Sequence, residues 1–310
     1  MKKKIYAGII GLGEWGKNII KTIKKDHPNI VLKSAAFKKS KYKYLLPKEC
    51  KIYLNWEKMI SNENLNCLFV ALPPQMNLKV LKGIKNKKIP LFLEKPLAAN
   101  LNDAKKIYKL SKNYNSSIQV NHIDLFNNSI IKAKKKLKGN VIKIQGFISS
   151  SSPNRTFLKP LWDYSPHFIA ITLAFFNELP KKIEAYNIGI DNSLKSKKNR
   201  QMVRINMYFK NSKVAEITAG NGTVKKIRKI YFFEKNNKYI YDNNSKNPLT
   251  YYKKQSKKKI VIKVNNLPSL TSSISNFLKN LKNNKKDILL GLNVVKILHL
   301  AEKSLMKKKK

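Results

Sequence analysis

A glycine-rich segment near the N-terminus has the spacing of a dinucleotide-binding loop. Gly11-Leu12-Gly13-Glu14-Trp15-Gly16 fits G-x-G-x-x-G directly after an apolar run at residues 5–10 and before a helical pattern. The first glycine allows a tight turn, the second lets a pyrophosphate approach the backbone, and the third lets helix and strand pack closely. N–H groups at the start of the helix would bind the phosphates. The alternative is a glycine-rich turn without a ligand, which this context disfavours.

The residues that follow the second apolar run bear on which dinucleotide binds. An acidic residue about 20 positions beyond the glycine loop usually binds the ribose hydroxyls of NAD, yet no acid occurs between Asp26 and Glu49. Lys38, Lys39 or Ser40 could instead receive the 2′-phosphate of NADP. Because lysine is common throughout this chain, the missing acid carries more weight than the lysines. The sequence therefore favours NADP slightly over NAD.

One lysine stands out by its position. Glu94-Lys95-Pro96 ends an apolar run at residues 90–94. Open parallel sheets bind ligands at the carboxyl ends of their strands, and this segment lies at such an end. We therefore expect Lys95 beside the nicotinamide of a bound dinucleotide, although a solvated lysine like the others is the alternative.

The elements that must position these residues are those of an α/β protein with two domains. Short apolar runs alternate with helical patterns up to residue 122, which predicts parallel β-α-β units and a Rossmann NAD(P)-binding domain at residues 1–122. The strands are continuously apolar, as in a sheet buried on both faces. Strands are expected at residues 5–10, 30–37, 67–72, 90–94 and 117–122, and helices at 15–25, 56–61, 77–84 and 101–112.

The pattern changes in residues 123–310, which we expect to form a second α/β domain for substrate binding and oligomerisation. Several apolar segments separated by Asn/Gly/Lys turns predict an open, mainly antiparallel sheet, and the closing helices are expected to pack back toward the Rossmann domain. Expected helices are 129–137, 167–176, 270–281 and 286–305; expected strands are 141–148, 182–190, 202–209, 214–218, 227–233 and 238–241, with a polar loop at 149–155.

Several of these motifs together resemble the Gfo/Idh/MocA family of oxidoreductases, named from glucose-fructose oxidoreductase and inositol dehydrogenase. The glycine loop, Leu72-Pro73-Pro74 and Leu93-Glu94-Lys95-Pro96-Leu97-Ala98 carry the resemblance. It extends over nearly the whole chain, through Val120-Asn121-His122, Trp162-Asp163-Tyr164-Ser165-Pro166-His167 and a closing helix with Gly291, Val295 and Ser304. It implies a Rossmann domain followed by an α/β domain whose open sheet often forms the subunit interface, and hence a homo-dimer or homo-tetramer.

The resemblance also implies an activity. It is that of an NAD(P)-dependent dehydrogenase or reductase acting on CH–OH groups, which transfers a hydride between nicotinamide and a secondary alcohol or ketone of a sugar, nucleotide sugar or cyclitol. Lys95 would bind and polarise the substrate hydroxyl. Cofactor contacts are expected from Gly11, Leu12, Gly13, Glu14, Trp15, Gly16, Lys38, Lys39, Ser40, Leu72, Pro73, Asn77, Glu94 and Lys95.

By the same resemblance, Asp163 and His167 form the acid/base pair. Oxidation of an alcohol needs a base within about 3 Å of the hydroxyl with a pKa near the working pH, which histidine provides. Asp163 lies four residues earlier, so in a helix it could orient the imidazole from the same face. The alternative is structural: Asp163 as a helix N-cap, with Pro166 in the first turn.

Other positions are less specific. Trp162 and Tyr164 could stack on a sugar ring or pack in the interior, and His122 could line the cleft between the domains. The chain departs from the family at Ala170, where an acid is common, at Ser165, where glycine is usual, and at Asn77, often histidine. The substrate therefore cannot be carried over from the family.

The net charge of +48 does not by itself indicate a nucleic-acid partner. Only four of the 65 basic residues are arginine, and the lysines are spread along the whole chain instead of clustering. We expect a small carbohydrate-like substrate and neither nucleic acid nor membrane as partner. Two hypotheses remain beside the dehydrogenase: a catalytically silent cofactor-binding sensor, and a polyanion-binding protein on a Rossmann scaffold.

Cysteine usage and hydropathy bear on the compartment. Cys50 and Cys67 are too few for a disulfide framework and too far apart for a metal pair, so we expect a reducing compartment and no metal site. No apolar run reaches the roughly 18–20 residues needed to span a bilayer. The N-terminal apolar run is explained by the glycine loop better than by a secretion signal. The sequence thus predicts a cytoplasmic protein.

Overall fold

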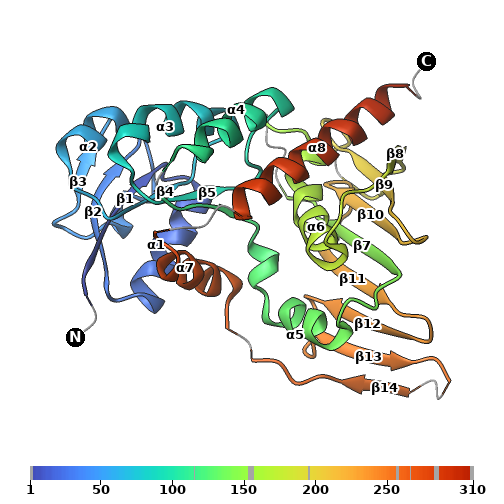
Figure 1. Ribbon diagram of the computed structural model, residues 1–310. Coiled ribbons are helices and arrows are strands. Elements are labelled where there is room, and N and C mark those ends of the chain that lie inside the picture. Colours follow the sequence, from blue (N-terminus) through green and yellow to red (C-terminus); the bar gives the residue numbers. More distant parts are fainter. Residues whose placement is uncertain are drawn as a thin grey trace. The chain divides into compact units, whose positions relative to one another are not determined.

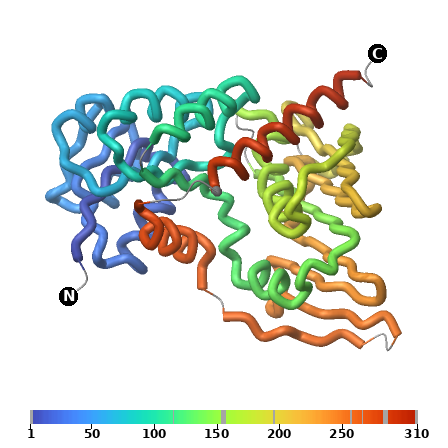
Figure 2. Tube along the Cα trace, viewed as in Figure 1, coloured from blue at the N-terminus to red at the C-terminus, as the bar shows by residue number. Residues whose placement is uncertain are grey.

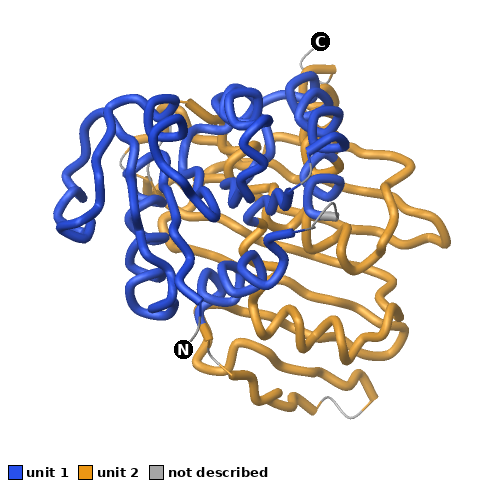
Figure 3. The backbone as a smooth tube through the Cα atoms, turned by 60° about the vertical axis from the view of Figure 1, so that its left-hand side comes forward, with its two compact units in different colours: residues 1–121, 268–292 blue, residues 122–267, 293–310 orange. Residues whose placement is uncertain are grey.

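The computed structural model describes residues 3–114, 116–152, 157–194, 196–255, 258–265, 267–282 and 286–307. Contacts divide the chain into two compact units, which Figure 3 colours: residues 1–121 with 268–292, and residues 122–267 with 293–310. Within the described ranges, no helix combines the length and apolar character needed to cross a bilayer.

The first unit contains a six-stranded parallel sheet in the order β3-β2-β1-β4-β5-β6, as the alternating pattern predicts for a Rossmann domain. The strand order reverses between β1 and β4, and ligands bind at the carboxyl ends of the strands beside such a point. The bounds are β1 Ile5–Ile10, β2 Ile30–Ala36, β3 Lys51–Tyr53, β4 Cys67–Val70, β5 Leu91–Glu94 and β6 Ile118–Asn121. Strand β3 was not predicted, because three partly exposed residues show no periodicity.

Helices cover both faces of this sheet (Figure 1). Each buries one apolar stripe: α1 buries Ile19, Ile20 and Ile23, as its 3.6-residue periodicity predicts. The bounds are α1 Glu14–Asp26, α2 Trp56–Asn62, α3 Asn77–Ile84 and α4 Leu101–Lys112, with short 3-10 turns η1 Lys43–Leu45, η2 Pro74–Met76 and η3 Lys85–Lys87.

A helix from the C-terminal part of the chain completes the first unit. Figure 2 shows α7, Ser269–Lys279, beside α1, and the Thr271 hydroxyl donates to the Asp26 carboxylate at 2.5 Å. Phe277 packs on the sheet, with its ring centre 5.7 Å from that of Phe69 and 5.5 Å from that of Phe92. A single domain boundary was expected after residue 122. In the structure residues 268–292 also belong to the first unit, and α7 within them makes this apolar contact with its sheet.

The second unit contains an eight-stranded sheet in the order β14-β13-β12-β11-β7-β10-β9-β8, antiparallel except for the parallel pair β7 and β10. The predicted open, mainly antiparallel sheet is thus confirmed. Its strands are β7 Lys143–Ser149, β8 Lys182–Ile188, β9 Met202–Tyr208, β10 Val214–Gly220, β11 Ile227–Phe233, β12 Asn237–Asp242, β13 Leu249–Lys253 and β14 Lys258–Val261. β13 and β14 were missed; the four residues of β14 are all exposed and begin with two lysines, so they read as loop.

Helices pack on one face of this second sheet. Helix α6, Pro160–Phe176, lies on β7, β9 and β10, and α5, Asn128–Leu137, contacts β12. Phe175 stacks on Phe232 at 4.3 Å, and at Gly146 a Cβ would lie 2.5 Å from the Phe168 ring, so glycine permits the close approach of α6 to β7. The 3-10 turn η4, Ile123–Phe126, also contacts α6, and α8, Lys286–Lys307, ends the chain.

The start of α6 corrects a prediction. A helix was expected at residues 167–176, but it begins seven positions earlier, with Pro160 at the first helical position and Pro166 inside the helix. Pro166 was read as a first-turn residue, whereas Pro160 has that role because its missing N–H costs nothing there. Asp163 therefore lies within α6, and the alternative in which it is an N-cap is wrong. The expected loop at 149–155 lies partly outside the described residues.

Candidate active site

The loop between β1 and α1 has the geometry of a phosphate cradle. Gly11 has a φ of +90°, and a Cβ there would lie 2.5 Å from the Ala71 carbonyl oxygen. A Cβ at Gly16 would lie 2.3 Å from the Gly11 carbonyl oxygen, so these two positions require glycine. At Gly13, by contrast, a Cβ would meet no described atom within 4 Å. This open space lies at the N-terminus of α1, where unpaired N–H groups favour phosphates.

The segment after β2 is tied to this loop by side chains. The Ser40 hydroxyl donates to the Leu12 carbonyl and accepts from the Tyr42 N–H at 3.0 Å. The Tyr42 hydroxyl donates to the Glu14 carboxylate, which also pairs with Lys17. A serine hydroxyl has one proton, so in this arrangement Ser40 orders the loop and has none left for a ligand. Of the three residues predicted to receive the 2′-phosphate of NADP, this leaves Lys38 and Lys39.

Asn77 supports the segment that contains Lys95. It is the first residue of α3 and is 1% exposed, and its amide nitrogen donates to the Leu97 carbonyl at 3.1 Å and to that of Pro96 at 3.5 Å. Its side-chain oxygen is buried and accepts no hydrogen bond from the described residues. That acceptor is therefore available to a donor of a bound ligand. Leu72 and Pro73 follow β4 immediately before η2.

Glu94 lies at the end of β5 in a buried network. Asn121 donates to its Oε1 at 2.7 Å, and Asn121 in turn accepts from the Ser273 hydroxyl at 2.8 Å. Burial raises the pKa of Glu94 to about 7, opposed by hydrogen bonds from Asn121 and Trp15 and by the charge of Lys95. The sequence singled out this segment for Lys95 alone, whereas the structure shows that Glu94 connects it to β6 and α7.

In the second unit, α6 presents the predicted acid/base pair. Asp163 and His167 lie one turn apart in this helix, as the sequence requires. The structure adds a second carboxylate: Oδ2 of Asp124, from η4, lies 2.6 Å from Nδ1 of His167. The guanidinium of Arg228 on β11 lies 3.3 Å from Oδ1 of the same aspartate. Sequence reasoning missed Asp124; its only signal was an acid two residues after the predicted strand end at His122.

The other predicted substrate residues belong to the second unit as well. Trp162 is 4% exposed and donates its indole N–H to Glu302 of α8 at 3.2 Å, so its side chain is used in packing α6 within this unit. The Tyr164 hydroxyl shares a hydrogen bond with Ser150 at 2.8 Å. His122 is buried immediately before η4. These contacts favour the structural alternative for Trp162 over stacking on a sugar.

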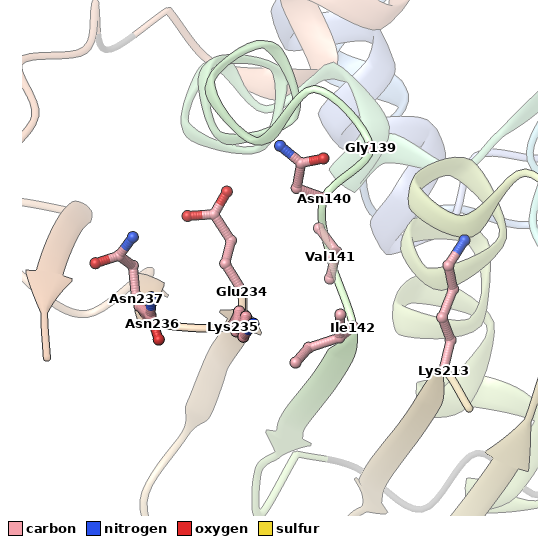
Figure 4. Close-up of a pocket in the computed structure, with 9 residues that line it drawn as sticks. All are labelled: Gly139, Asn140, Val141, Ile142, Lys213, Glu234, Lys235, Asn236 and Asn237. Atoms are coloured by element: carbon pink, nitrogen blue, oxygen red, sulfur yellow. The ribbon is translucent and has the colours of Figure 1, made fainter. Parts of the chain in front are cut away.

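A surface hollow of about 440 Å³ lies elsewhere in the second unit (Figure 4). It is lined by residues 139–142, by Lys213, and by residues 234–237 at the turn between β11 and β12. None of the predicted site residues lines it. The hollow therefore adds nothing to the candidate site.

Known proteins resemble the first unit of this chain in sequence. Residues 5–122 match the Gfo/Idh/MocA family model, described as an oxidoreductase family with an NAD-binding Rossmann fold. The similarity to the Gfo/Idh/MocA family model is thus that of this one domain. A relative in Saccharomyces cerevisiae, the uncharacterized protein YMR315W, is 31% identical over 116 residues, which are 35% of this chain and 33% of the relative. The chain spans about a third of the length of the curated relatives it matches.

Solved structures extend the similarity to both units. UDP-N-acetylglucosamine 3-dehydrogenase GnnA from Acidithiobacillus ferrooxidans has a TM-score of 0.85 at 14% identity, with 99% of each chain covered. Myo-inositol 2-dehydrogenase from Lactobacillus plantarum has a TM-score of 0.83 at 18% identity, covering 99% of this chain and 98% of that one. At these identities the similarity establishes a shared fold for the whole chain.

Proposed function

We propose that this protein is an NAD(P)-dependent oxidoreductase that transfers a hydride between a nicotinamide and a secondary alcohol or ketone of a sugar, nucleotide sugar or cyclitol. The observation that carries the proposal is the cradle at residues 11–16, where Gly13 leaves open space at a helix N-terminus beside the switch point of the sheet. The match of residues 5–122 to the Gfo/Idh/MocA family model and the fold shared with dehydrogenases of a nucleotide sugar and of an inositol support it.

In the proposed reaction, bound oxidised nicotinamide supplies the hydride acceptor. The ammonium group of Lys95 binds the substrate oxygen and stabilises the negative charge that develops there. His167 takes the hydroxyl proton: the O–H bond breaks, its proton joins the imidazole, the carbon loses hydride, and the carbonyl forms. In the reverse direction, protonated His167 returns the proton to the alkoxide oxygen.

For the cofactor, we propose a modest preference for NADP over NAD. No carboxylate occurs in the segment 37–42 after β2, and Lys38 and Lys39 can neutralise a 2′-phosphate. Ser40 does not contribute a donor in this arrangement, because its proton is used by Leu12. The preference therefore rests on charge.

We also propose a homo-oligomer that uses the open face of the second sheet, and a cytoplasmic location. That face, opposite α6, carries half-exposed aromatic residues such as Tyr208 and Tyr231. Light scattering of the purified protein tests the assembly. The location is supported by the two cysteines, Cys50 and Cys67, which are free and buried, as expected in a reducing compartment.

A two-step experiment tests the activity. Tryptophan fluorescence titration with NADH and NADPH identifies the cofactor, since Trp15 lies in the cradle, and inositols, hexoses and nucleotide sugars are then screened with the oxidised form. With a substrate identified, Lys95→Ala should lower kcat/KM by about 10²–10⁴-fold. Lys106→Ala, an exposed lysine of α4, is the matched control and should change nothing. A Lys95→Ala variant within a few-fold of wild type would contradict the proposed mechanism.

A further inference from the structure

A buried carboxylate lies against the histidine of α6, although the two are far apart in the sequence. Asp124 in η4 and His167 are 4% and 8% exposed, and their Oδ2 and Nδ1 atoms lie 2.6 Å apart. Both residues, and the arginine that pairs with the aspartate, belong to the second unit. The whole arrangement therefore lies within this unit.

The short distance defines where a proton must be. An ionised carboxylate has only acceptor sites, and an unprotonated imidazole nitrogen is an acceptor too, so the two would repel at 2.6 Å. A proton on Nδ1 turns the repulsion into a charge-assisted contact. In the neutral imidazole, Nε2 then carries the lone pair, and it is the nitrogen that can accept a proton from a substrate.

Arg228 keeps the aspartate ionised and in place. Its guanidinium lies 3.3 Å from Oδ1, so the two carboxylate oxygens have different partners, an arginine and a histidine. Tyr241 on β12 lies near the same pair: burial raises the pKa of its hydroxyl, and the negative charge of Asp124 raises it further while Arg228 lowers it. A buried carboxylate is stable when it is paired in this way.

The helix that carries His167 packs on an apolar part of the sheet. Strands β7, β9 and β10, on which α6 packs, carry buried apolar side chains such as Ile144, Ile205 and Ile217. Among the described residues, charged or titratable groups near this pair include Asp124 from η4, Arg228 from β11 and Tyr241 from β12, and α6 itself carries Asp163 and Tyr164.

We propose that Asp124 is the positioning residue of His167: it holds the imidazole with the proton on Nδ1, so that Nε2 exchanges the proton with the substrate, and Arg228 holds Asp124. This assigns the positioning of Nδ1 to Asp124, and it rests on the proposed function for the identity of the reaction. In alcohol oxidation the carboxylate also stabilises the imidazolium that forms when Nε2 accepts the proton.

Nitrogen NMR of the ligand-free protein tests the positioning directly. The chain has four histidines, so labelled histidine gives few signals, and His167→Gln identifies those of His167. Wild-type His167 should show a protonated Nδ1 and an unprotonated Nε2 near neutral pH. In Asp124→Asn the amide can donate to Nδ1, so the proton should move to Nε2. Asp163→Asn, on the same helix, is the matched control and should leave the signals of His167 in the wild-type tautomer.

Kinetics give a second readout once a substrate is identified. Asp124→Asn should lower kcat by about 10²–10⁴-fold with KM nearly unchanged, because it changes the base and not the binding groups. Asp124→Glu, which keeps the charge, should recover part of the loss. A purely structural role would instead raise KM and lower kcat alike in both variants, and would overturn the proposal.

The outcomes separate the positioning from the proposed activity. Protonated Nε2 in the wild type overturns the role of Asp124, and this measurement needs no variant to fold. An unchanged tautomer in folded Asp124→Asn overturns it as well, as does a shift caused by Asp163→Asn alone. If the tautomer moves as expected but no tested alcohol reacts, the positioning is supported and the proposed function is contradicted.

Discussion

Replacing Glu94 with glutamine should remove a large part of the pH dependence of unfolding. Burial raises the pKa of this carboxyl from its ordinary value of 4.5 to about 7. The folded protein therefore holds a proton that the unfolded chain has lost between these two pH values. Stability falls as the pH rises through this window, in contrast to the usual aspartate or glutamate whose pKa is lowered on folding.

The size of the effect follows from the shift. A change of one pKa unit corresponds to about 1.4 kcal/mol, so this shift costs about 3 kcal/mol once the group is ionised in both states. Between about pH 5 and about pH 8 the contribution to the free energy of unfolding should change by about 2.5 kcal/mol, because part of the loss has occurred by the lower pH. Over this pH range the free energy of unfolding of wild type should therefore fall by about 2.5 kcal/mol more than that of Glu94→Gln.

Urea unfolding followed by tryptophan fluorescence measures the difference at the two pH values. Other groups titrate in both proteins, so only the difference between wild type and variant is attributed to Glu94. Ser273→Ala is the control: it removes a donor to Asn121 and should lower stability by about 1 kcal/mol, yet keep the wild-type pH dependence. If wild type and Glu94→Gln lose the same free energy over this range, the raised pKa of Glu94 is refuted.

Three further variants test the first unit. Gly13→Ala should unfold like wild type, because its Cβ meets no described atom, but should weaken NADPH binding, because that Cβ enters the space assigned to the pyrophosphate. The control is Gly189→Ala, where a Cβ is equally uncrowded but lies in the second unit. This variant should bind NADPH normally in the same fluorescence titration. Replacing Lys38 and Lys39 together by glutamate should reduce affinity for NADPH more than for NADH, and equal losses would contradict the charge-based preference. Phe277→Ala should cost about 3–5 kcal/mol in unfolding experiments, since its ring is fully buried against Phe69.

The Rossmann sheet was predictable because its rules are local. An apolar run, a glycine loop and an amphipathic helix follow one another within residues 5–26, and each is visible in a short window. The elements that were missed lack such a signal: β14 is four exposed residues that hydrogen-bond to β13. Their pairing depends on a neighbouring strand that the local pattern does not reveal. The start of α6 was predicted wrongly for another reason: Pro160 and Pro166 are both compatible with the first turn of a helix, and the sequence alone does not show which of them begins it.

In the candidate site, too, the features within one short segment were predicted and the contact between distant segments was not. The glycine cradle follows from spacing within one segment and was predicted. The pairing of Asp163 with His167 was also predicted from their spacing, although the helix was expected to begin only at His167. Spacing, however, identifies an acid near a histidine and not the nitrogen that carries the proton. Here that proton depends on Asp124, which η4 brings against α6 through tertiary packing. Because a base acts through its unprotonated nitrogen, this long-range contact, and not the pattern D-x-x-x-H, decides which atom of His167 faces the chemistry.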